Sequence, residues 1–134
     1  ECLPYDDSAI ALWVSGAQLR KMILYMLRDE VWEGSHCEFF QFSEGVRVIY
    51  DRQSHILKEF SLYGEPIDDT KIYKIGLQYY FYLNMKDFFS LSHEEVEQNG
   101  NPRRVATSCR EILEEYLSCH QGLDHQIDGR LKFE

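Results

Sequence analysis

Residues 9–26 read AIALWVSGAQLRKMILYM, and this stretch decides the class of fold. The run from Ala9 to Val14 is short and apolar, which predicts a buried strand. Gly16 then breaks the run. After the break, apolar residues recur at i, i+3, i+4 and i+7, at Leu19, Met22, Ile23 and Met26. This spacing predicts an amphipathic helix of about four turns over residues 16–31, which Gly34-Ser35 ends.

Strand signals dominate the middle of the chain. Residues 46–50 alternate in character before a turn-like Asp-Arg-Gln-Ser sequence, and residues 55–62 form a second run that Gly64-Glu65-Pro66 closes. Residues 72–79, rich in Ile and Tyr, predict a third strand. The short turn between the first two strands predicts an antiparallel hairpin within a larger sheet.

Two S-x-x-E sequences in the last third, at Ser92 and Ser108, predict helix starts, because their side chains satisfy free amides at a helix N-terminus. The second helix would end before Gly122, with an apolar face of Cys109, Ile112, Leu113, Tyr116 and Leu117. Residues 127–133 predict a last short strand. The order strand, helix, several strands, helix, strand is typical of an α+β fold and not of repeated βαβ units.

The composition limits the function. Residues 1–134 are the size of a single domain, and an apolar content of 44% excludes a disordered chain. A formal net charge of −9 excludes a binder of nucleic-acid polymers, which needs a basic surface. The chain has no apolar run of about 18 residues, so we expect no membrane insertion. It begins with neither a Met nor a signal peptide, so we expect a fragment of a longer protein.

Two groups of residues near the start and middle of the chain resemble the C-terminal domain of the 5'-nucleotidase family. Leu3-Pro4-Tyr5 and Ser15-Gly16 are similar to the family's L-P-F and T-G-x-x-L. Residues 40–51 resemble its F-x-Q-x-S-G strand, which continues to V-x-Y-D, with one residue inserted before Gly45.

Two later groups continue the resemblance in the same order. Gly64-Glu65-Pro66-Ile67, followed by Tyr73-Lys74-Ile75, is similar to the family's G-x-P-L and Y-x-V. Residues 127–131 resemble its closing E-G-R-I. The resemblance covers nearly all of this chain and the later part of the family's domain.

The resemblance implies a fold and a role. The family's domain is a layered α/β/β/α arrangement, with mixed β-sheets flanked by helices. It sandwiches the base of a nucleotide between two aromatic rings and holds the ribose with an aspartate. By resemblance, this chain is expected to recognise a nucleoside or nucleotide.

The motif match assigns these roles to three residues. The first ring belongs to L-P-F and falls on Tyr5. The second ring and the ribose-binding carboxylate belong to the family's F-L-A-N-G-G-D-G-F, which matches residues 81–89 and gives Phe81 and Asp87. The match needs one inserted residue just before Phe81, so Tyr80 is the alternative ring.

The same residues also have a purely structural interpretation. An aromatic run such as residues 79–82 is more often part of a core, Tyr5 lies near a terminus, and Asp87 alone would be a solvated carboxylate. Met85-Lys86 and Phe88 replace the family's glycines and could fill or redirect the ribose site. The alternative hypothesis is therefore an interaction module, for example for a homodimer, with a degenerated nucleotide pocket.

The sequence predicts no catalytic residue and no metal site in this chain. The histidines and cysteines match no zinc spacing, carboxylate pairs such as Asp6-Asp7 are expected to be solvated, and no phosphate-binding loop or nucleophile elbow occurs. The resemblance implies instead an N-terminal metallophosphoesterase domain with divalent metals that activate water. It also favours an extracytoplasmic or cell-surface location, and leaves nucleoside monophosphates, UDP-sugars and cyclic nucleotides open as substrates.

The disulfide state stays open at this point. Cys109 lies on the apolar face of a predicted helix, which favours a buried free thiol. The spacing selects no pairing among the four cysteines, Cys2, Cys37, Cys109 and Cys119.

Overall fold

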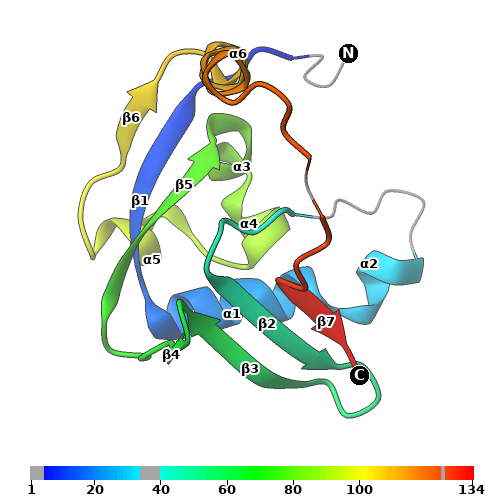
Figure 1. Cartoon of the computed structure of the whole chain (residues 1–134). Coiled ribbons are helices and arrows are strands. Elements are labelled where there is room, and N and C mark those ends of the chain that lie inside the picture. The colour runs from blue at the N-terminus through cyan, green and yellow to red at the C-terminus, as the bar shows by residue number, and fades with distance from the viewer. Residues whose placement is uncertain (1–4, 34–39, 125) are drawn as a thin grey trace.

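The computed structural model describes residues 5–33, 40–124 and 126–134 (Figure 1). Its elements, in chain order, are β1 (Ala9–Ser15), α1 (Gly16–Met26), α2 (Asp29–Glu33), β2 (Val46–Asp51), β3 (Ile56–Leu62), β4 (Glu65–Pro66), β5 (Ile72–Gln78), α3 (Tyr79–Leu83), α4 (Met85–Phe89), α5 (His93–Glu97), β6 (Arg103–Ala106), α6 (Cys109–Cys119) and β7 (Leu131–Phe133). Within these ranges, no helix is long and apolar enough to cross a membrane.

The strands of the described ranges form two sheets (Figure 1). One sheet has the order β5-β1-β6 and is antiparallel, and the other has the order β4-β3-β2-β7. β2 and β3 form the antiparallel hairpin that the sequence predicts, and β7 lies parallel to β2. The mixed sheet and the separate helices confirm the expected α+β class.

Two apolar clusters hold the sheets, and α1 belongs to both. Met22 packs with buried side chains of β1, α4 and α5, whereas Ile23 packs with buried side chains of β2 and β3. Leu19 and Met26 contact both clusters. Each fully buried aliphatic side chain contributes roughly 1.5–3 kcal/mol to folding. The helix therefore joins the apolar clusters of the two sheets.

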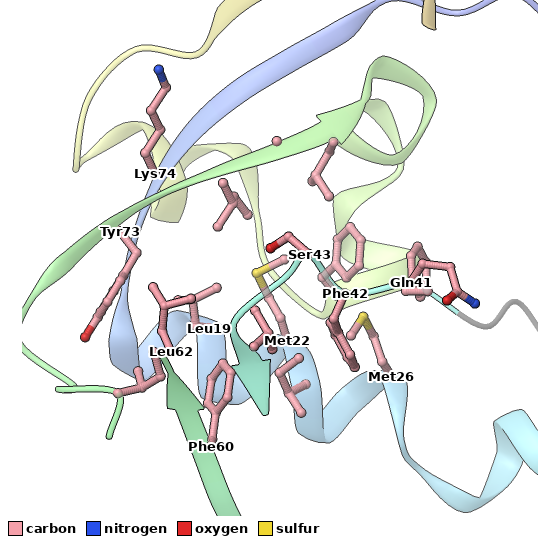
Figure 2. A pocket seen from close by; sticks show the side chains of 18 of the residues that line it. Leu19, Met22, Met26, Gln41, Phe42, Ser43, Phe60, Leu62, Tyr73 and Lys74 are labelled. Atoms are coloured by element: carbon pink, nitrogen blue, oxygen red, sulfur yellow. The ribbon is translucent and has the colours of Figure 1, made fainter. Parts of the chain in front are cut away.

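An apolar cavity of about 440 Å³ lies between the two sheets (Figure 2). Its walls include Leu19 and Met22 of α1, residues 40–43, the end of β3 and the strand β5. Protein interiors are normally close-packed. The described residues therefore leave the space along β5 incompletely filled, and we call it the inter-sheet cavity.

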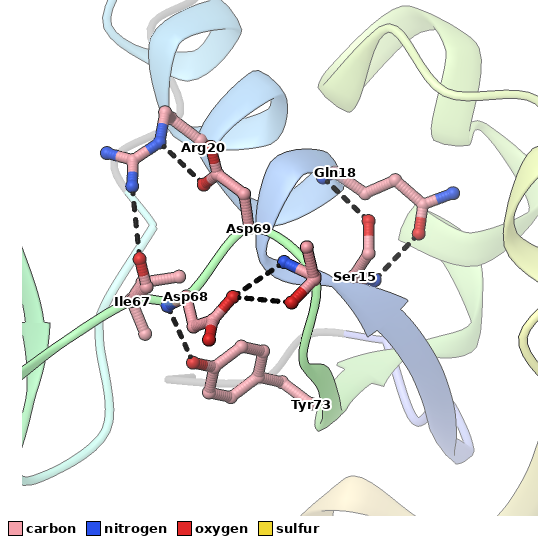
Figure 3. A network of polar contacts seen from close by, with 8 residues as sticks. Ser15, Gln18, Arg20, Ile67, Asp68, Asp69 and Tyr73 are labelled. Carbon is pink, nitrogen blue, oxygen red and sulfur yellow. Dashed lines mark hydrogen bonds and ion pairs between the residues drawn. The ribbon is translucent and has the colours of Figure 1, made fainter.

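The turn from β1 into α1 is fixed by a reciprocal pair of hydrogen bonds (Figure 3). The Ser15 hydroxyl accepts a hydrogen bond from the Gln18 amide at 3.2 Å, and the Ser15 amide donates to Gln18 Oε1 at 2.8 Å. This capping box satisfies amides that the helix itself leaves without acceptors.

Gly16 is required at this turn because a second chain segment approaches it closely. Its amide donates to the carbonyl of Lys71 at 3.0 Å, and the Ala17 amide donates to the carbonyl of Asp69 at 3.1 Å. A Cβ atom at residue 16 would overlap the carbonyl oxygen of Asp68. We call residues 67–71 the connecting loop, because they lead from the second sheet into β5 of the first.

Side chains hold the connecting loop as well (Figure 3). Arg20 donates to the carbonyl of Ile67 at 3.2 Å and pairs with the carboxylate of Asp69 at 3.1 Å. The amide of Asp68 donates to the hydroxyl oxygen of Tyr73 at 3.0 Å. The loop is thus tied to α1 on one side and to β5 on the other.

The first helix is shorter than the predicted helix over residues 16–31. α1 ends at Met26, and the short helix α2 follows after a break. The indole Nε1 of Trp32 donates to the carbonyl of Leu27 at 3.3 Å, which occupies an acceptor that a continuing helix would use. Gly34-Ser35, the predicted helix end, lies outside the described residues.

Later elements also differ from the expectation. β5 ends at Gln78, and the aromatic run over residues 79–82 begins a helix. The sequence does not predict β6, which is a strand because it pairs with β1. The last strand, β7, is shorter than the predicted strand over residues 127–133. Gly129, with a φ of 73°, turns the chain just before β7.

Both predicted helix starts are confirmed. The hydroxyl of Ser92 accepts from the Glu95 amide at 3.1 Å, and that of Ser108 accepts from the Glu111 amide at 3.0 Å. The helix that follows Ser92 is the short α5, whereas the helix that follows Ser108, α6, is long enough to carry the predicted apolar face.

The apolar face of α6 is not covered by the described part of the chain. Ile112, Tyr116 and Leu117 are exposed at 44%, 44% and 46%. Cys109 is a free thiol, as expected, but it is half-buried and not buried. Cys119 is free and exposed, and the other two cysteines lie outside the described residues.

The two tryptophans lie in different halves of the fold. Trp13 is on β1, where Arg103 and Lys74 lie 5.7 Å and 6.0 Å from its ring centre. Trp32 is on α2 and packs edge-on against Phe133 of β7, with 4.9 Å between ring centres. Each indole is therefore tied to a different sheet.

We expect Gly16→Ala to destabilise the fold by about 1–3 kcal/mol, because the added methyl group overlaps the connecting loop. Urea denaturation followed by circular dichroism measures the change. Gly76→Ala is the matched control, since an added Cβ there meets nothing within 4 Å. A Gly16→Ala variant as stable as the Gly76→Ala variant would contradict this role of Gly16.

The turn between β2 and β3 depends on the charge of Asp51. Its Oδ1 accepts hydrogen bonds from the amides of Gln53 and Ser54 at 2.9 Å and 3.1 Å, and Lys58 lies 3.2 Å from its other oxygen. These contacts, with Ser54 first and Lys58 next, lower the pKa of Asp51 from 3.8 to about 2.

Because the pKa of Asp51 is lower in the folded chain, its stabilising effect is present above pH 3.8 and is lost as the pH falls toward about 2. We therefore expect Asp51→Ala to lower the urea midpoint near neutral pH, and the difference from the wild type to shrink in that window. Glu115→Ala, which removes an equal charge from an exposed position on α6, is the control. A deficit for Asp51→Ala that is constant with pH would rule out this linkage.

Candidate functional site

The candidate site is built on α3 and α4, which together form an aromatic hairpin over residues 79–89. The residue before α3, Gln78, provides no side-chain cap. Instead, the Tyr79 amide donates to the carbonyl of Ser8 at 2.8 Å, and the Tyr80 amide donates to Asp7 Oδ2 at 2.6 Å. The N-terminal segment therefore supplies the cap of α3.

Core packing fixes the orientation of the aromatic hairpin. Met85 and Phe89 of α4 are each 1% exposed and belong to the cluster that includes β1. Asn84 separates α3 from α4, and Ser90, with a φ of 57°, ends α4. The other aromatic side chains of the hairpin are thereby held near the surface.

Phe81 lies in a group of aromatic rings. Its ring centre is 4.9 Å from that of Phe40 and 5.0 Å from that of Phe88, at interplanar angles of 68° and 86°. Such edge-to-face contacts are favourable beyond the area that they bury. Phe81 is therefore half-buried in a defined orientation, next to the core.

Tyr80, the alternative ring, is more exposed than Phe81. It is 53% exposed, and its ring centre lies 5.5 Å from that of Phe81 and 5.8 Å from that of Phe88. Asp87 is exposed on α4, and its amide donates to the carbonyl of Asn84 at 3.0 Å. Among the described residues, no side chain pairs with the Asp87 carboxylate.

Tyr5 is 84% exposed and precedes Asp7 by two residues. Two residues of chain span at most about 7 Å, and the Asp7 carboxylate binds the start of α3. The segment that follows Tyr5 therefore contacts the start of the aromatic hairpin. Phe81 and Asp87 lie on this hairpin, and the roles of Tyr5, Phe81 and Asp87 in ligand binding stay a prediction.

The pair Asp6-Asp7 is more than a solvated turn. Asp6 Oδ1 accepts from the Ser108 hydroxyl at 2.7 Å, and the carbonyl of Asp7 accepts from the Cys109 amide at 2.7 Å. Burial, followed by the charges of Asp7 and Asp6, raises the pKa of the Cys109 thiol. The segment that carries Tyr5 is thus held between the N-termini of α3 and α6.

Met85, Lys86 and Phe88, which replace the glycines of the family's motif, differ in burial and in contacts. Met85 points into the core and takes no part in a surface pocket. Lys86 is exposed. Phe88 packs against Phe81, and its ring centre also lies 6.1 Å from that of Phe40, so it is the replacement that contacts Phe81.

The sequence reasoning missed three residues that shape the site. Phe88 could have been noticed, because it follows Phe81 by seven residues and would share its face on a continuous helix. Phe40 and Asp7 reach the hairpin from distant parts of the chain, and no local pattern signals their contacts.

Within the described part of the chain, no group of three His, Cys, Asp or Glu side chains could hold a metal ion. The divalent metals that the family resemblance implies are expected on a separate domain. The candidate site on this chain consists of aromatic rings, a carboxylate and backbone groups.

No family model and no curated protein matches this sequence. Solved structures do. The crystal structure of a 5'-nucleotidase precursor from Thermus thermophilus matches with a TM-score of 0.78 and 18% identity, over 98% of this chain and 26% of that one. The Haemophilus influenzae NAD nucleotidase matches with a TM-score of 0.76 and 17% identity, over 98% of this chain and 25% of that one.

The Thermus thermophilus sulfate thiohydrolase SoxB, in complex with glycerol, is similar with a TM-score of 0.54 and 16% identity. The match extends over 96% of this chain and 22% of that one. At these identities the comparisons establish the fold, and they confirm the fold expected from the resemblance to the 5'-nucleotidase family. The chain spans about a quarter of the length of the structures that it matches.

We expect Asp7→Ala to release the start of α3, because Tyr80 and Ser8 lose the carboxylate that accepts from their amides. Loss of a helix cap costs about 1 kcal/mol, so hydrogen exchange at the Tyr80 amide should quicken about fivefold. Asp87→Ala is the control, since its carboxylate pairs with no described residue. An unchanged exchange rate at Tyr80 in Asp7→Ala would contradict the capping role.

Proposed function

We propose that this chain recognises a nucleoside or nucleotide for a metal-dependent phosphohydrolase, and that a separate domain hydrolyses the phosphate ester. The observation that carries the proposal is the aromatic hairpin. It presents half-exposed rings and the exposed carboxylate of Asp87, which no described side chain pairs with, and its first residues contact the segment that follows Tyr5. The fold shared with a 5'-nucleotidase and an NAD nucleotidase supports the same role.

In this proposal the base stacks between Tyr5 and Phe81. A ring is a good platform when its own orientation is fixed, because less freedom is lost on binding. Phe40 and Phe88 fix Phe81 in this way. Stacking on an aromatic side chain contributes roughly 1–3 kcal/mol per base. Tyr80 is the alternative platform, since a larger part of its ring is exposed.

Asp87 would accept hydrogen bonds from the ribose hydroxyls. A carboxylate has two oxygens and accepts only, which suits a pair of neighbouring hydroxyl donors. Hydrogen bonds to a charged group are stronger than those between neutral groups. This arrangement would favour a ribonucleoside over an analogue that lacks both hydroxyls.

Hydrolysis would belong to a part of the protein outside these residues. The chain spans about a quarter of the similar structures, which leaves room for another domain in proteins of that length. The divalent metals implied by the family resemblance would supply activated water there. The residues of this chain would bind the nucleotide and orient it, and none of them would act on the phosphate.

The proposal predicts that adenosine binds more tightly than 2',3'-dideoxyadenosine, and that Asp87→Asn reduces the difference, because the amide keeps one neutral acceptor oxygen. Loss of charge-assisted hydrogen bonds should weaken adenosine binding roughly tenfold to a hundredfold. An NMR titration of the labelled chain with adenosine, AMP, uridine and the dideoxy analogue measures this. We expect the shifts to centre on Tyr5, Tyr80, Phe81 and Asp87.

Glu65→Gln is the matched control, because it removes an exposed carboxylate from the second sheet. Equal affinity for adenosine and its dideoxy analogue would exclude the ribose role of Asp87. A folded chain without shifts at millimolar nucleoside would exclude the nucleoside site itself.

A further inference from the structure

β5 has an edge that no described strand covers. It pairs with β1 on one side and is the last strand of its sheet on the other. Within the described ranges, no backbone hydrogen bond to that second edge is found for residues 72–78. An open strand edge presents a row of amide and carbonyl groups that another strand can bind.

The inter-sheet cavity runs along this edge. Tyr73, Ile75 and Leu77 are opposite the core-facing residues of β1, so their side chains point to the same side of the sheet, while Lys74 and Gly76 point to the other. All five residues border the cavity. A cavity beneath one face alone would touch alternate residues. This one therefore reaches the backbone of β5.

The other walls of the cavity suit apolar side chains. They include Leu19 and Met22 of α1, Phe42 of the segment before β2, and Phe60 and Leu62 of β3 (Figure 2). Lys74 is the sole charged residue on the described lining. A strand beside β5 would point every second side chain toward these walls.

We propose that an extended polypeptide strand with apolar residues at alternate positions pairs with the open edge of β5 and fills the inter-sheet cavity. The strand comes from polypeptide outside these 134 residues, as the chain covers only about a quarter of the similar structures. Backbone pairing distinguishes it from a lipid tail, which fills an apolar cavity but offers no amide or carbonyl to the edge.

This strand would complete the first sheet between β5 and the second sheet. It would also contact α1, which links the two apolar clusters. The aromatic hairpin follows β5 directly, so the added strand would steady the element that carries the candidate site. The inference does not depend on what the candidate site binds.

The test uses a random library of nine-residue peptides displayed on phage and selected on the immobilised chain. We expect enriched peptides with apolar residues at alternate positions. In hydrogen exchange, a synthetic enriched peptide should protect alternate amides of residues 72–78, those that face away from β1. Protection at these amides, about tenfold or more, distinguishes backbone pairing from cavity filling.

Leu62→Lys places a charge on the cavity wall and should weaken peptide binding about tenfold or more. Ile56→Lys, at an exposed position of the same strand, is the matched control and should bind as the wild type does. Circular dichroism checks that both variants fold. The exchange measurement on the wild-type chain decides the question if Leu62→Lys does not fold.

Several results would overturn the inference. An unenriched library, or enriched peptides without the alternation, would exclude a strand-binding edge. Protection outside residues 72–78 would place the peptide elsewhere. Competition by decanoate without any protected amide would identify a lipid-binding cavity. A dimer in sedimentation that protects the same amides would identify a second copy of the chain as the occupant.

Discussion

The contact between the start of α1 and the connecting loop determines how the two sheets meet. The first amides of a helix need acceptors outside it, and two amides of α1 donate to the carbonyls of Lys71 and Asp69. The approach is so close that residue 16 has no room for a side chain. The ladder between β1 and β5 begins beside this contact, where Ser15 pairs with Ile72. The places of α1, of β5 and of the aromatic hairpin after β5 therefore all depend on it.

The fold could be predicted from the sequence because most of its motifs consist of residues that a helix cap, a turn with positive φ or a close backbone approach requires. Ser15-Gly16 combines a helix cap with a close approach. Gly45 and Gly64 each have a φ of 83°, and Gly129 has a φ of 73°, which is a region that favours glycine. The hydroxyl of Tyr73 accepts from the connecting loop. Local geometry selects the helix cap and the glycines with a positive φ, so these can be recognised in the sequence, whereas the need for glycine at residue 16 comes from the distant connecting loop.

The candidate site could be predicted only in part, because its contacts join distant segments. Residues 79–82 are aromatic and favour a strand by composition, yet Asp7 caps them as a helix from 73 positions away. Phe40 reaches Phe81 in the same long-range manner. β6 likewise becomes a strand through its pairing with β1. Phe81 and Asp87 lie on one hairpin, and their role in ligand binding stays a prediction.

The placement of the two tryptophans gives each half of the fold its own optical signal. The emission of an indole depends on the polarity and rigidity of its surroundings. Trp13 lies with two cations on the first sheet, and Trp32 packs against Phe133 of the second. Probes that change together report one cooperative unit, and probes that change apart report two. The chain therefore carries one tryptophan in each half of the fold. In single Trp→Phe variants, the fluorescence of the remaining tryptophan would report whether the two sheets unfold together or separately.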